Sequence, residues 1–579
     1  MARVLLRLLS RYAKPYGWHL LIVVIAQVMA TMATLALPRL NADIIDHGIA
    51  TGDTGYIGST GLVMLGVAGL QVVCEVAATF FAARATMGIG RDLRADLFEQ
   101  VTDLSVHQVQ QFGPGTLLTR TTNDVEQVQS LALVVASTVL LSPIMLVGGL
   151  VMAMEQDVVL SAVVWVAVPV LLLFVWLLFA RVMPLFQAMQ DSIDGVNTVL
   201  REQIAGIRVV RAFVREAEQT RRFDRANRKL TAISLGIGRW MVLMGPVIAM
   251  ILQAAMVAVL YFGGHRVAAG EVQVGGVAAL MQYLTLILMA VMMGVFVFMM
   301  IPRAAVAARR IQEVLTTEPE LDSPHQQKAQ PASAELVFDH VQVQLPGAEA
   351  PIVDEVSFRI PPGTTTAIIG STGSGKTTLV KLMTRLIDPT AGAVRIGGVD
   401  LREIPRARLS DLVGLAPQTA TLLSGTVGSN LGFATPEATE EQMHQALEIA
   451  QCRDFLPEGP QDALEYPISQ GGANLSGGQR QRLSIARALV GGRQIYVFDD
   501  ALSALDASTE AAVRAGLTRY QRSSGASVVM VDQRVAAITE ADQILVLEGG
   551  RIVGVGTHAE LSQSNPVYRQ IMDSQQVTS

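Results

Sequence analysis

Six long apolar stretches are the strongest constraint on how this chain can fold. Each has about 20 residues or more, the length that an α-helix needs to cross the hydrocarbon core of a bilayer. Backbone groups find no water inside a bilayer, so such stretches must fold as helices. The composition agrees, since 51% of the residues are hydrophobic and 16% are charged. The stretches lie at about 18–38, 58–83, 130–154, 158–180, 240–264 and 273–301.

The distribution of Lys and Arg predicts which loops face the cytosol. The N-terminal leader carries Arg3, Arg7, Arg11 and Lys14, and the segment between the fourth and fifth stretches is rich in arginine. The loops on the other side, such as "NADIIDHGIATGDTGY" and "EQD", are acidic or nearly uncharged. We therefore expect both termini in the cytosol. The leader has no small-residue cleavage site, so we expect no cleavable signal peptide.

The remaining segments predict how the chain divides. The inner segments, about 84–129 and 181–239, are long and polar with helical apolar spacing, so they form either solvated amphipathic helices or rods that continue the spans. We favour rods. Residues 316–335 are rich in Pro, Ser and Gln, which indicates a linker. The sequence thus predicts a membrane domain at 1–315, this linker, and a cytosolic α/β domain at 336–579.

The cytosolic part contains a phosphate-binding pattern. "GSTGSGKTT" follows the apolar strand "TTAIIG" and precedes a helical segment, the context that G-x-x-x-x-G-K-[ST] requires. Backbone amides of such a loop cradle phosphate oxygens, the Lys reaches the β- and γ-phosphates, and the Thr that follows it binds Mg²⁺. The phosphate loop comprises Gly370, Ser371, Thr372, Gly373, Ser374, Gly375, Lys376, Thr377 and Thr378.

Two further features belong with this loop. Asp499 ends the apolar strand "IYVF", where a Mg²⁺-orienting aspartate is expected. Upstream, a hydroxyl and two glycines begin an amphipathic helix, which makes a second anion site or a simple helix cap. Beside the phosphate loop we favour the anion site, serving a nucleotide on a neighbouring chain. Its residues are Leu475, Ser476, Gly477, Gly478 and Gln479.

With these motifs the chain resembles the ATP-binding cassette (ABC) transporters, specifically half-transporters of the six-helix exporter type. Gln418 matches the Q-loop glutamine, which would join Thr377 and Asp499 at Mg²⁺, and "SALD" ending at Asp506 matches the D-loop. "FGPGTLLTRTTNDVEQVQ" and "GIRVVRAFVRE" resemble coupling regions. The resemblance implies a dimer in which each ATP lies between one chain's phosphate loop and the other chain's signature, residues 475–479.

This chain departs from the family pattern within one composite site. Asp500 stands where the family has a catalytic glutamate, and Gln533 stands where it has a switch histidine. Leu345 replaces the aromatic that stacks on adenine, and Gln470 replaces a frequent glutamate. An aspartate is one methylene shorter, and a misplacement of about 1 Å can cost roughly 100-fold in rate. We therefore expect slow hydrolysis here and a non-identical partner with an intact glutamate and histidine.

The leading functional prediction is a subunit of a bacterial cytoplasmic-membrane exporter of amphipathic drugs or lipid-like compounds. Import of a siderophore, or a chiefly regulatory ATP-binding subunit, are alternatives. Six spans exclude a soluble ABC ATPase, and a net charge of −6 gives no sign of a nucleic-acid partner. Glu75 in the second span is a candidate group for cationic substrates or protons, or else it lies near the inner interface. The Met-rich stretch 289–300 suits apolar ligands, although ordinary lipid-facing or inter-helix packing is the favoured explanation.

Overall fold

A computed structural model describes residues 2–139, 141–321, 330–345 and 347–576. Part of the expected linker, residues 322–329, lies outside the described residues. The chain divides into two compact units. Unit 1 comprises Met1–Thr102 and Phe112–Thr317, and unit 2 comprises Asp103–Gln111 and Glu318–Ser579.

Unit 1 is helical throughout its described residues. Long apolar sequences with few helix breakers form long helices, joined by short turns and by π-helical segments (η2, η3 and η4). Its elements are α1 (Ala2–Ala13), η1 (Lys14–Tyr16), α2 (Gly17–Asp43), η2 (Ile44–Ile49), α3 (Thr54–Asp103), α5 (Pro114–Thr119), η3 (Arg120–Asp124), α6 (Val125–Val134), η4 (Val135–Val139), α7 (Leu141–Gln156), α8 (Val158–Ala205), α9 (Ile207–Ala212), α10 (Glu216–Ala268) and α11 (Val274–Leu315).

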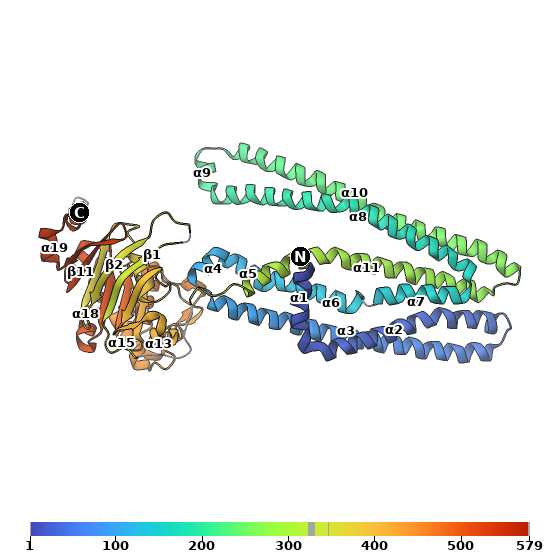
Figure 1. Ribbon diagram of the computed structural model, residues 1–579, viewed down its shortest axis with the longest axis horizontal. Helices are drawn as coiled ribbons and strands as arrows, with labels where there is room; N and C mark the ends of the chain where they lie inside the picture. The colour runs from blue at the N-terminus through green and yellow to red at the C-terminus, as the bar shows by residue number, and fades with distance from the viewer. Residues whose placement is uncertain (1, 140, 322–329, 346, 577–579) are drawn as a thin grey trace. The chain divides into compact units, whose positions relative to one another are not determined.

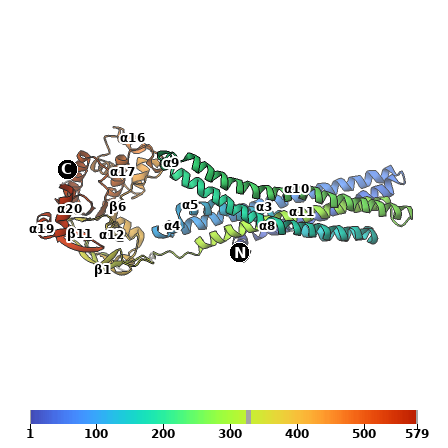
Figure 2. The ribbon, with the colours of Figure 1, turned by 90° about the horizontal axis from the view of Figure 1, so that it is seen from above.

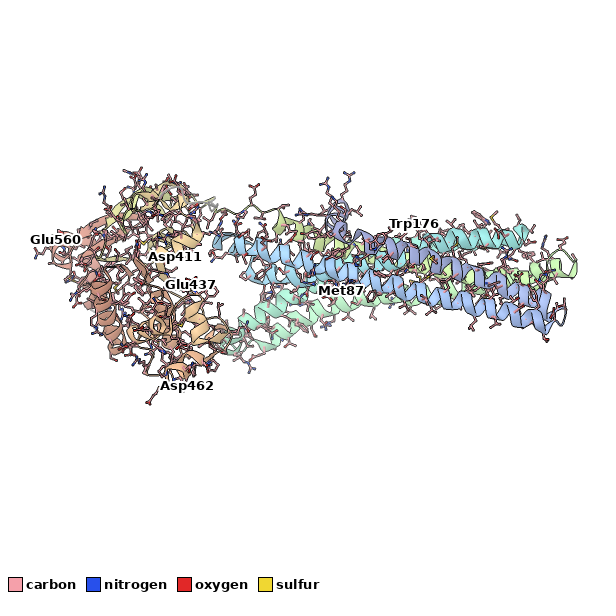
Figure 3. All side chains as sticks on the ribbon, turned by 90° about the horizontal axis from the view of Figure 1, so that it is seen from below. Met87, Trp176, Asp411, Glu437, Asp462 and Glu560 are labelled. Atoms are coloured by element: carbon pink, nitrogen blue, oxygen red, sulfur yellow. The ribbon has the colours of Figure 1, made fainter. Side chains whose placement is uncertain are left out.

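Six helical segments in the described part of the chain are long and apolar enough to cross a membrane. Several are far longer than a bilayer requires: α3 has 50 residues and α10 has 53. At a rise of about 1.5 Å per residue a helix of this length spans roughly 75 Å, against roughly 30 Å of hydrocarbon. The prediction of six spans that continue as helices beyond the bilayer is therefore confirmed. Large apolar side chains such as Met87 and Trp176 are exposed along these helices (Figure 3).

The helices of unit 1 pack around α11, which contacts α2, α6, α7 and α10. Pro302 lies inside α11 and does not end it. Leu280, Leu284 and Ile287 on this helix are fully buried in one apolar cluster with residues of α8 and α10. The helices α8 and α10 run along each other and form an arm capped by α9 (Figures 1 and 2). In Figure 1 this arm diverges from the other helices of unit 1 toward α9.

Unit 2 is an α/β unit with three sheets. The strand order is β12-β11-β3-β10-β9-β6 in the six-stranded sheet, β2-β1-β4-β5 in the four-stranded sheet and β7-β8 in the smallest. Its strands are β1 (Leu336–Val343), β2 (Val353–Ile360), β3 (Thr365–Gly370), β4 (Ala391–Ile396), β5 (Val399–Asp400), β6 (Val413–Ala416), β7 (Gly425–Thr426), β8 (Pro467–Ile468), β9 (Ile495–Asp499), β10 (Ser527–Val531), β11 (Gln543–Glu548) and β12 (Arg551–Gly556).

Helices flank these strands. The central strands β3, β9 and β10 are almost wholly buried, as expected of parallel strands covered on both faces. The helices and helical turns are α4 (Val106–Phe112, which begins in unit 2 and ends in unit 1), α12 (Lys376–Met383), η5 (Leu401–Glu403), α13 (Arg406–Leu412), α14 (Val427–Gly432), α15 (Glu440–Ile449), α16 (Pro460–Glu465), η6 (Gln470–Gly472), α17 (Gly477–Leu489), α18 (Ala507–Ser524), η7 (Val535–Ala537), α19 (His558–Ser564) and α20 (Pro566–Gln576).

An aromatic pair anchors the four-stranded sheet. Phe338 on β1 and Phe358 on β2 stack with ring centroids 4.3 Å apart, and their exposed fractions are 1% and 7%. The two residues face each other directly in the antiparallel register. The pair joins a core cluster that extends to β3 and α12, the elements on either side of the phosphate loop. Packing of this cluster therefore fixes the loop's two ends.

We predict that Phe338→Ala lowers the free energy of unfolding of unit 2 by about 3–5 kcal/mol, because it removes buried contacts and leaves a cavity. The measurement is urea unfolding of the full chain in detergent, with protease digestion reporting the unfolded fraction. The matched control is Phe433→Ala, whose ring is 68% exposed and whose loss should change the free energy by less than about 0.5 kcal/mol. Equal effects of the two substitutions would contradict this account of the core.

Candidate nucleotide-binding site

Sheet order brings the predicted site residues to one edge. The strands β3, β10 and β9 are parallel neighbours, and Val531 pairs directly with Asp499. Because parallel strands end at the same edge, the segments that follow them converge. The phosphate loop follows β3, Asp500 follows β9, and Gln533 follows β10. Strands far apart in sequence thus assemble one site.

The phosphate loop has the backbone that close approach to an anion requires. Gly373 and Gly375 have φ values of +82° and +103°, which residues other than glycine rarely adopt. A Cβ atom at Gly375 would lie 3.0 Å from the carbonyl oxygen of Ile352. The buried hydroxyl of Ser374 has no hydrogen-bond partner within the described part of the chain. An unsatisfied donor in a glycine-lined turn fits phosphate oxygens.

Lys376 begins α12 and is only 9% exposed. Its Nζ atom donates hydrogen bonds to the carbonyl oxygens of Gly370 and Ser371, at 2.7 and 2.8 Å. Burial lowers the pKa of this ammonium group, and the carboxylates of Asp500 and Asp499 partly oppose the shift. A buried cation held by neutral carbonyls gains from a nearby anion. The lysine therefore fits the terminal phosphates of a nucleotide.

A hydroxyl and a carboxylate lie side by side next to this lysine. The Thr377 hydroxyl donates a 3.3 Å hydrogen bond to Oδ1 of Asp499, which is 5% exposed. Burial raises the pKa of Asp499, and the charge of Asp500 adds to the rise. The described residues contain no cluster of three or more His, Cys, Asp or Glu that could hold a metal. Two oxygen groups fit Mg²⁺, which usually completes its shell with phosphates and waters.

Asp500 is held between two glutamines. Its Oδ2 atom accepts a hydrogen bond from Nε2 of Gln418 and another from Nε2 of Gln533, both at 3.3 Å. Its backbone has φ of +49°, and its N–H donates to the carbonyl of Val531 at 2.9 Å. A left-handed residue other than glycine costs about 1–3 kcal/mol and marks a functional site more often than chance. The structure thus brings Asp500, Gln418 and Gln533 into direct contact.

The signature residues form a helix start. Ser476 caps α17, accepting from the Gln479 N–H at 3.2 Å, while Oε1 of Gln479 accepts from the Ser476 N–H at 2.8 Å. Leu475 is buried, and a Cβ atom at Gly478 would lie 3.3 Å from the carbonyl of Ala504. A Cβ atom at Gly477 would meet nothing within 4 Å. The geometry therefore shows the helix cap and an open turn at Gly477, and the anion site stays a prediction.

Asp506 and Leu345, two further predicted site residues, have surroundings different from those of the residues described above. Asp506 caps α18, and hydrogen bonds from Ser508 and from the Thr509 N–H hold the pKa of its carboxyl well below the usual range. Leu345 is 43% exposed, while the Pro346 beside it lies outside the described residues. The geometry therefore gives Asp506 a structural task, and it leaves the leucine side chain accessible.

Sequence reasoning missed a charged network behind Gln533. Glu510 on α18 is 6% exposed and accepts from Arg534 at 2.7 Å and also from Arg514. Asp532 accepts from the N–H groups of Gln533 and Arg534 at 2.7 and 2.9 Å, and burial raises its pKa. The network ties the loop of Gln533 to α18. Its only sequence signal is charge beside the apolar strand "SVVMV".

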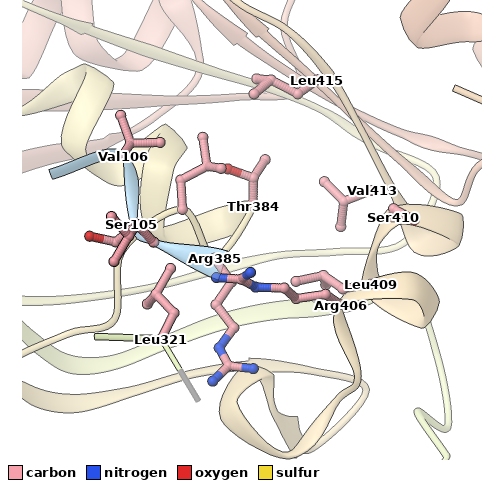
Figure 4. A pocket seen from close by; sticks show the side chains of 12 residues that line it. Ser105, Val106, Leu321, Thr384, Arg385, Arg406, Leu409, Ser410, Val413 and Leu415 are labelled. Atoms are coloured by element: carbon pink, nitrogen blue, oxygen red, sulfur yellow. The ribbon is translucent and has the colours of Figure 1, made fainter. Parts of the chain in front are cut away.

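A second missed feature lies N-terminal to the first predicted coupling region. Residues 103–111 belong to unit 2, where the Ser105 hydroxyl donates to Glu320 at 2.6 Å and Gln108 donates to the carbonyl of Glu318 at 2.8 Å. Beside this segment lies a cavity of about 390 Å³ (Figure 4). Its apolar lining includes Leu104, Val106, Leu321, Leu409, Val413 and Leu415.

Comparison with known families accounts for both units. The model of the ABC transporter transmembrane region matches residues 20–291, and the ABC transporter model matches residues 353–503. The chain belongs to the ABC transporters. An ABC transporter ATP-binding protein of Mycobacterium tuberculosis (strain CDC 1551 / Oshkosh) is 43% identical to it, over 99% of each chain.

Two further similarities refine this assignment. A multidrug efflux ATP-binding/permease protein of Mycobacterium bovis (strain BCG / Pasteur 1173P2) is 31% identical over 97% of this ABC transporter chain and 47% of its own length. The structure of a bacterial Atm1-family ABC exporter with ATP bound matches with a TM-score of 0.77 and 21% identity, over 98% of each chain. The predicted exporter-type half-transporter fold is confirmed, with six spans followed by a nucleotide-binding domain.

We predict that Glu510→Ala lowers the free energy of unfolding of unit 2 by about 1–3 kcal/mol, since Arg514 loses its carboxylate partner and Arg534 keeps only the longer contact with Asp532. The value is below that of a fully buried pair because the Arg534 side chain is about half exposed. Urea unfolding of the full chain measures the change. Glu437→Ala, at an exposed loop position, is the control and should change it by less than about 0.5 kcal/mol. A Glu510 variant as stable as this control would contradict the network.

Proposed function

We propose that this ABC transporter subunit forms one half of a heterodimeric exporter and hydrolyses ATP slowly at its own phosphate loop. Its intact signature completes the faster site, which the partner's phosphate loop forms. The exporter moves amphipathic drugs or lipid-like compounds across a bacterial cytoplasmic membrane. The observation that carries the proposal is the Asp500 carboxylate, which accepts from Gln418 and Gln533 and has no histidine partner among the residues that the structure describes.

The position of Asp500 supports slow hydrolysis. A carboxylate after the magnesium-binding aspartate must reach and polarise the attacking water. Asp500 has a side chain one methylene shorter than glutamate, and its Oδ2 atom already accepts two amide hydrogen bonds. The nearby Gln533 can donate a hydrogen bond, but it cannot carry the positive charge of a protonated histidine. Leu345 offers adenine apolar contact without an aromatic face.

ATP and Mg²⁺ binding have separate support. The phosphate loop, with Ser371, Thr372 and Thr378 at its rim, presents amides and the buried ammonium of Lys376 to the phosphates. Thr377 and Asp499 would hold Mg²⁺, and Gln418, which contacts the neighbouring Asp500, would be the third ligand. When bound, Mg²⁺ neutralises charge on the phosphate oxygens. The chain's own groups bind and orient the nucleotide, so ATP would be held tightly even where turnover is slow.

The residues at positions 500 and 533 suggest that the partner subunit is not a second copy of this chain. ABC exporters work as dimers, and a homodimer of this chain would place Asp500 and Gln533 at both sites. The multidrug efflux relative is about twice as long as the part that this chain matches, which is consistent with two half-transporters joined in one protein. The proposed partner is therefore a second half-transporter with a glutamate after its magnesium-binding aspartate and a switch histidine.

The membrane-spanning helices offer surfaces suited to apolar substrates. Met289, Met293 and Phe296 on α11 are exposed, as is Glu75 on α3. Flexible thioethers adapt to ligands of different shapes, and a carboxylate suits a cationic group. We propose these residues as substrate contacts. We also propose domain bounds of 1–315, 316–335 and 336–579, with both termini in the cytosol.

We predict that Asp500→Glu combined with Gln533→His raises ATP hydrolysis by about tenfold or more, because it restores the reach and charge that the water requires. The measurement is phosphate release by the partnered complex in proteoliposomes. Adding Lys376→Ala to the double variant should abolish the gain, which assigns it to this chain's own site. An unchanged rate with ATP still bound would discredit the account of a slow site.

We further predict that the chain alone binds ATP but shows little substrate-stimulated hydrolysis, whereas co-expression with a half-transporter encoded beside it restores stimulation. Hydrolysis and dye transport in inside-out vesicles provide the readouts. Nucleotide trapping should find ATP retained at this chain's phosphate loop while the partner's site turns over. Full stimulated hydrolysis by the lone chain would rule out the heterodimer.

A further inference from the structure

The N-terminal helix α1 has two unlike faces. Leu5, Leu8 and Tyr12, spaced by three and four residues, are 4%, 3% and 7% exposed and pack against unit 1. On the opposite face, Arg3, Arg7 and Arg11 follow one another at four-residue spacing and are all exposed, and the exposed Lys14 lies just beyond the helix. Residues at this spacing share one side of a helix. The exposed face is therefore a continuous row of cations, called here the basic stripe (Arg3, Arg7, Arg11 and Lys14).

Two tyrosines hold α1 and the turn after it against α3. The hydroxyl of Tyr12 donates to Oδ2 of Asp96 at 2.5 Å, and the hydroxyl of Tyr16 donates to Oδ2 of Asp92 at 2.8 Å. The two tyrosines are four residues apart in sequence, and so are the two aspartates, so the two hydrogen bonds lie one helical turn apart. These two bonds are called here the tyrosine–aspartate ladder. A Cβ atom at Gly88 would lie 2.3 Å from the Tyr16 ring, so only glycine lets the ring lie this close. Figure 1 shows α1 crossing the long helices rather than running along them.

The ladder fixes the level of α1 relative to the bilayer. On α3 the apolar stretch ends just before Arg84, and Gly88 lies one turn further toward the cytosol. The N-terminal end of α2 is at the same level, since Tyr16 immediately precedes it. Trp18 on the first turn of α2 is 70% exposed. Exposed tryptophans mark the boundary between hydrocarbon and headgroups, so α1 lies at the cytosolic headgroup layer.

The basic stripe has no internal counter-charge. Within the described part of the chain, none of its four cations forms an ion pair, whereas Arg120, Arg222 and Arg266 in the same unit each do. The acids of α3 that contact this part of the chain are already engaged, because Asp92 accepts from Tyr16 and pairs with Arg91, and Asp96 accepts from Tyr12. Four like charges in a row are therefore left for an external anion.

We propose that the basic stripe of α1 is a binding surface for anionic phospholipids of the cytoplasmic leaflet. The charges complement phosphate-bearing headgroups with a net negative charge, and the helix is held at their depth by the tyrosine–aspartate ladder. Zwitterionic headgroups offer no net charge to the row, so the surface selects lipids by charge. This inference depends on the membrane topology alone, and it stands or falls independently of the slow ATP site.

The test uses Trp18 as a local reporter in the full chain reconstituted in nanodiscs. Brominated phosphatidylglycerol or brominated phosphatidylcholine is supplied at equal mole fraction, and quenching of the emission that Trp18→Phe removes is compared. This difference isolates one of the four tryptophans. Phosphatidylglycerol should quench it at least about twofold more, because each cation near the surface attracts anionic lipid. Raising the salt concentration should reduce the excess.

Two triple variants locate the effect. Arg3→Gln, Arg7→Gln and Arg11→Gln together should equalise quenching by the two lipids. Arg221→Gln, Arg225→Gln and Lys229→Gln remove the same charge at the same spacing from exposed positions on α10, before its apolar stretch, and should leave the preference intact. An unchanged far-ultraviolet circular-dichroism spectrum, which the long helices of unit 1 dominate, confirms that each variant is folded.

Three outcomes would overturn the proposal. Equal quenching by the two lipids in the unaltered chain would show that the stripe does not select anionic lipid. Quenching by neither lipid would show that protein, such as a second subunit, covers this surface. A preference that survives loss of the three α1 arginines would assign it to other residues.

Discussion

Backbone N–H and C=O groups inside the hydrocarbon layer must form hydrogen bonds within the protein, and the architecture of unit 1 depends on this constraint. It makes each span a helix, and the sequence then continues four of those helices, α3, α8, α10 and α11, without a break for 42 residues or more. A continuous helix transmits displacement because its hydrogen bonds run along its axis. Unit 1 is therefore built from rods whose apolar halves suit the bilayer and whose polar halves suit water.

In unit 2 the burial of the central strands determines where the candidate site lies. Burying both faces of the central strands leaves only their ends for chemistry. The order β3-β10-β9 places the phosphate loop, Asp499 and the Asp500–Gln533 contact at neighbouring strand ends. Strand order and burial set this scaffold, so the hydrolysis rate proposed above depends on the length of the Asp500 side chain rather than on a change of fold.

The sequence predicts much of this arrangement because its signals are local. Span length, the spacing around Lys376 and the strand before Asp499 are patterns within a few residues of each other. The missed features depend on partners distant in sequence: Glu510 with Arg534, Ser105 with Glu320, and Tyr12 with Asp96. The presence of a charged or polar residue in the sequence does not predict which distant residue it will contact. The capping box at Ser476 lies between these cases, since its spacing was visible but the same spacing also suits an anion site.

The ion pair between Glu510 and Arg534 links the start of α18 to the segment that carries Gln533. The helix α18 begins at the D-loop aspartate Asp506, and Glu510 lies on its first turn. Any shift of that helix start, such as one imposed by an approaching subunit, would pull the guanidinium of Arg534 and with it the adjacent Gln533. A displacement of α18 would thus reach Gln533, the residue proposed above as the counterpart of the switch histidine, through this ion pair.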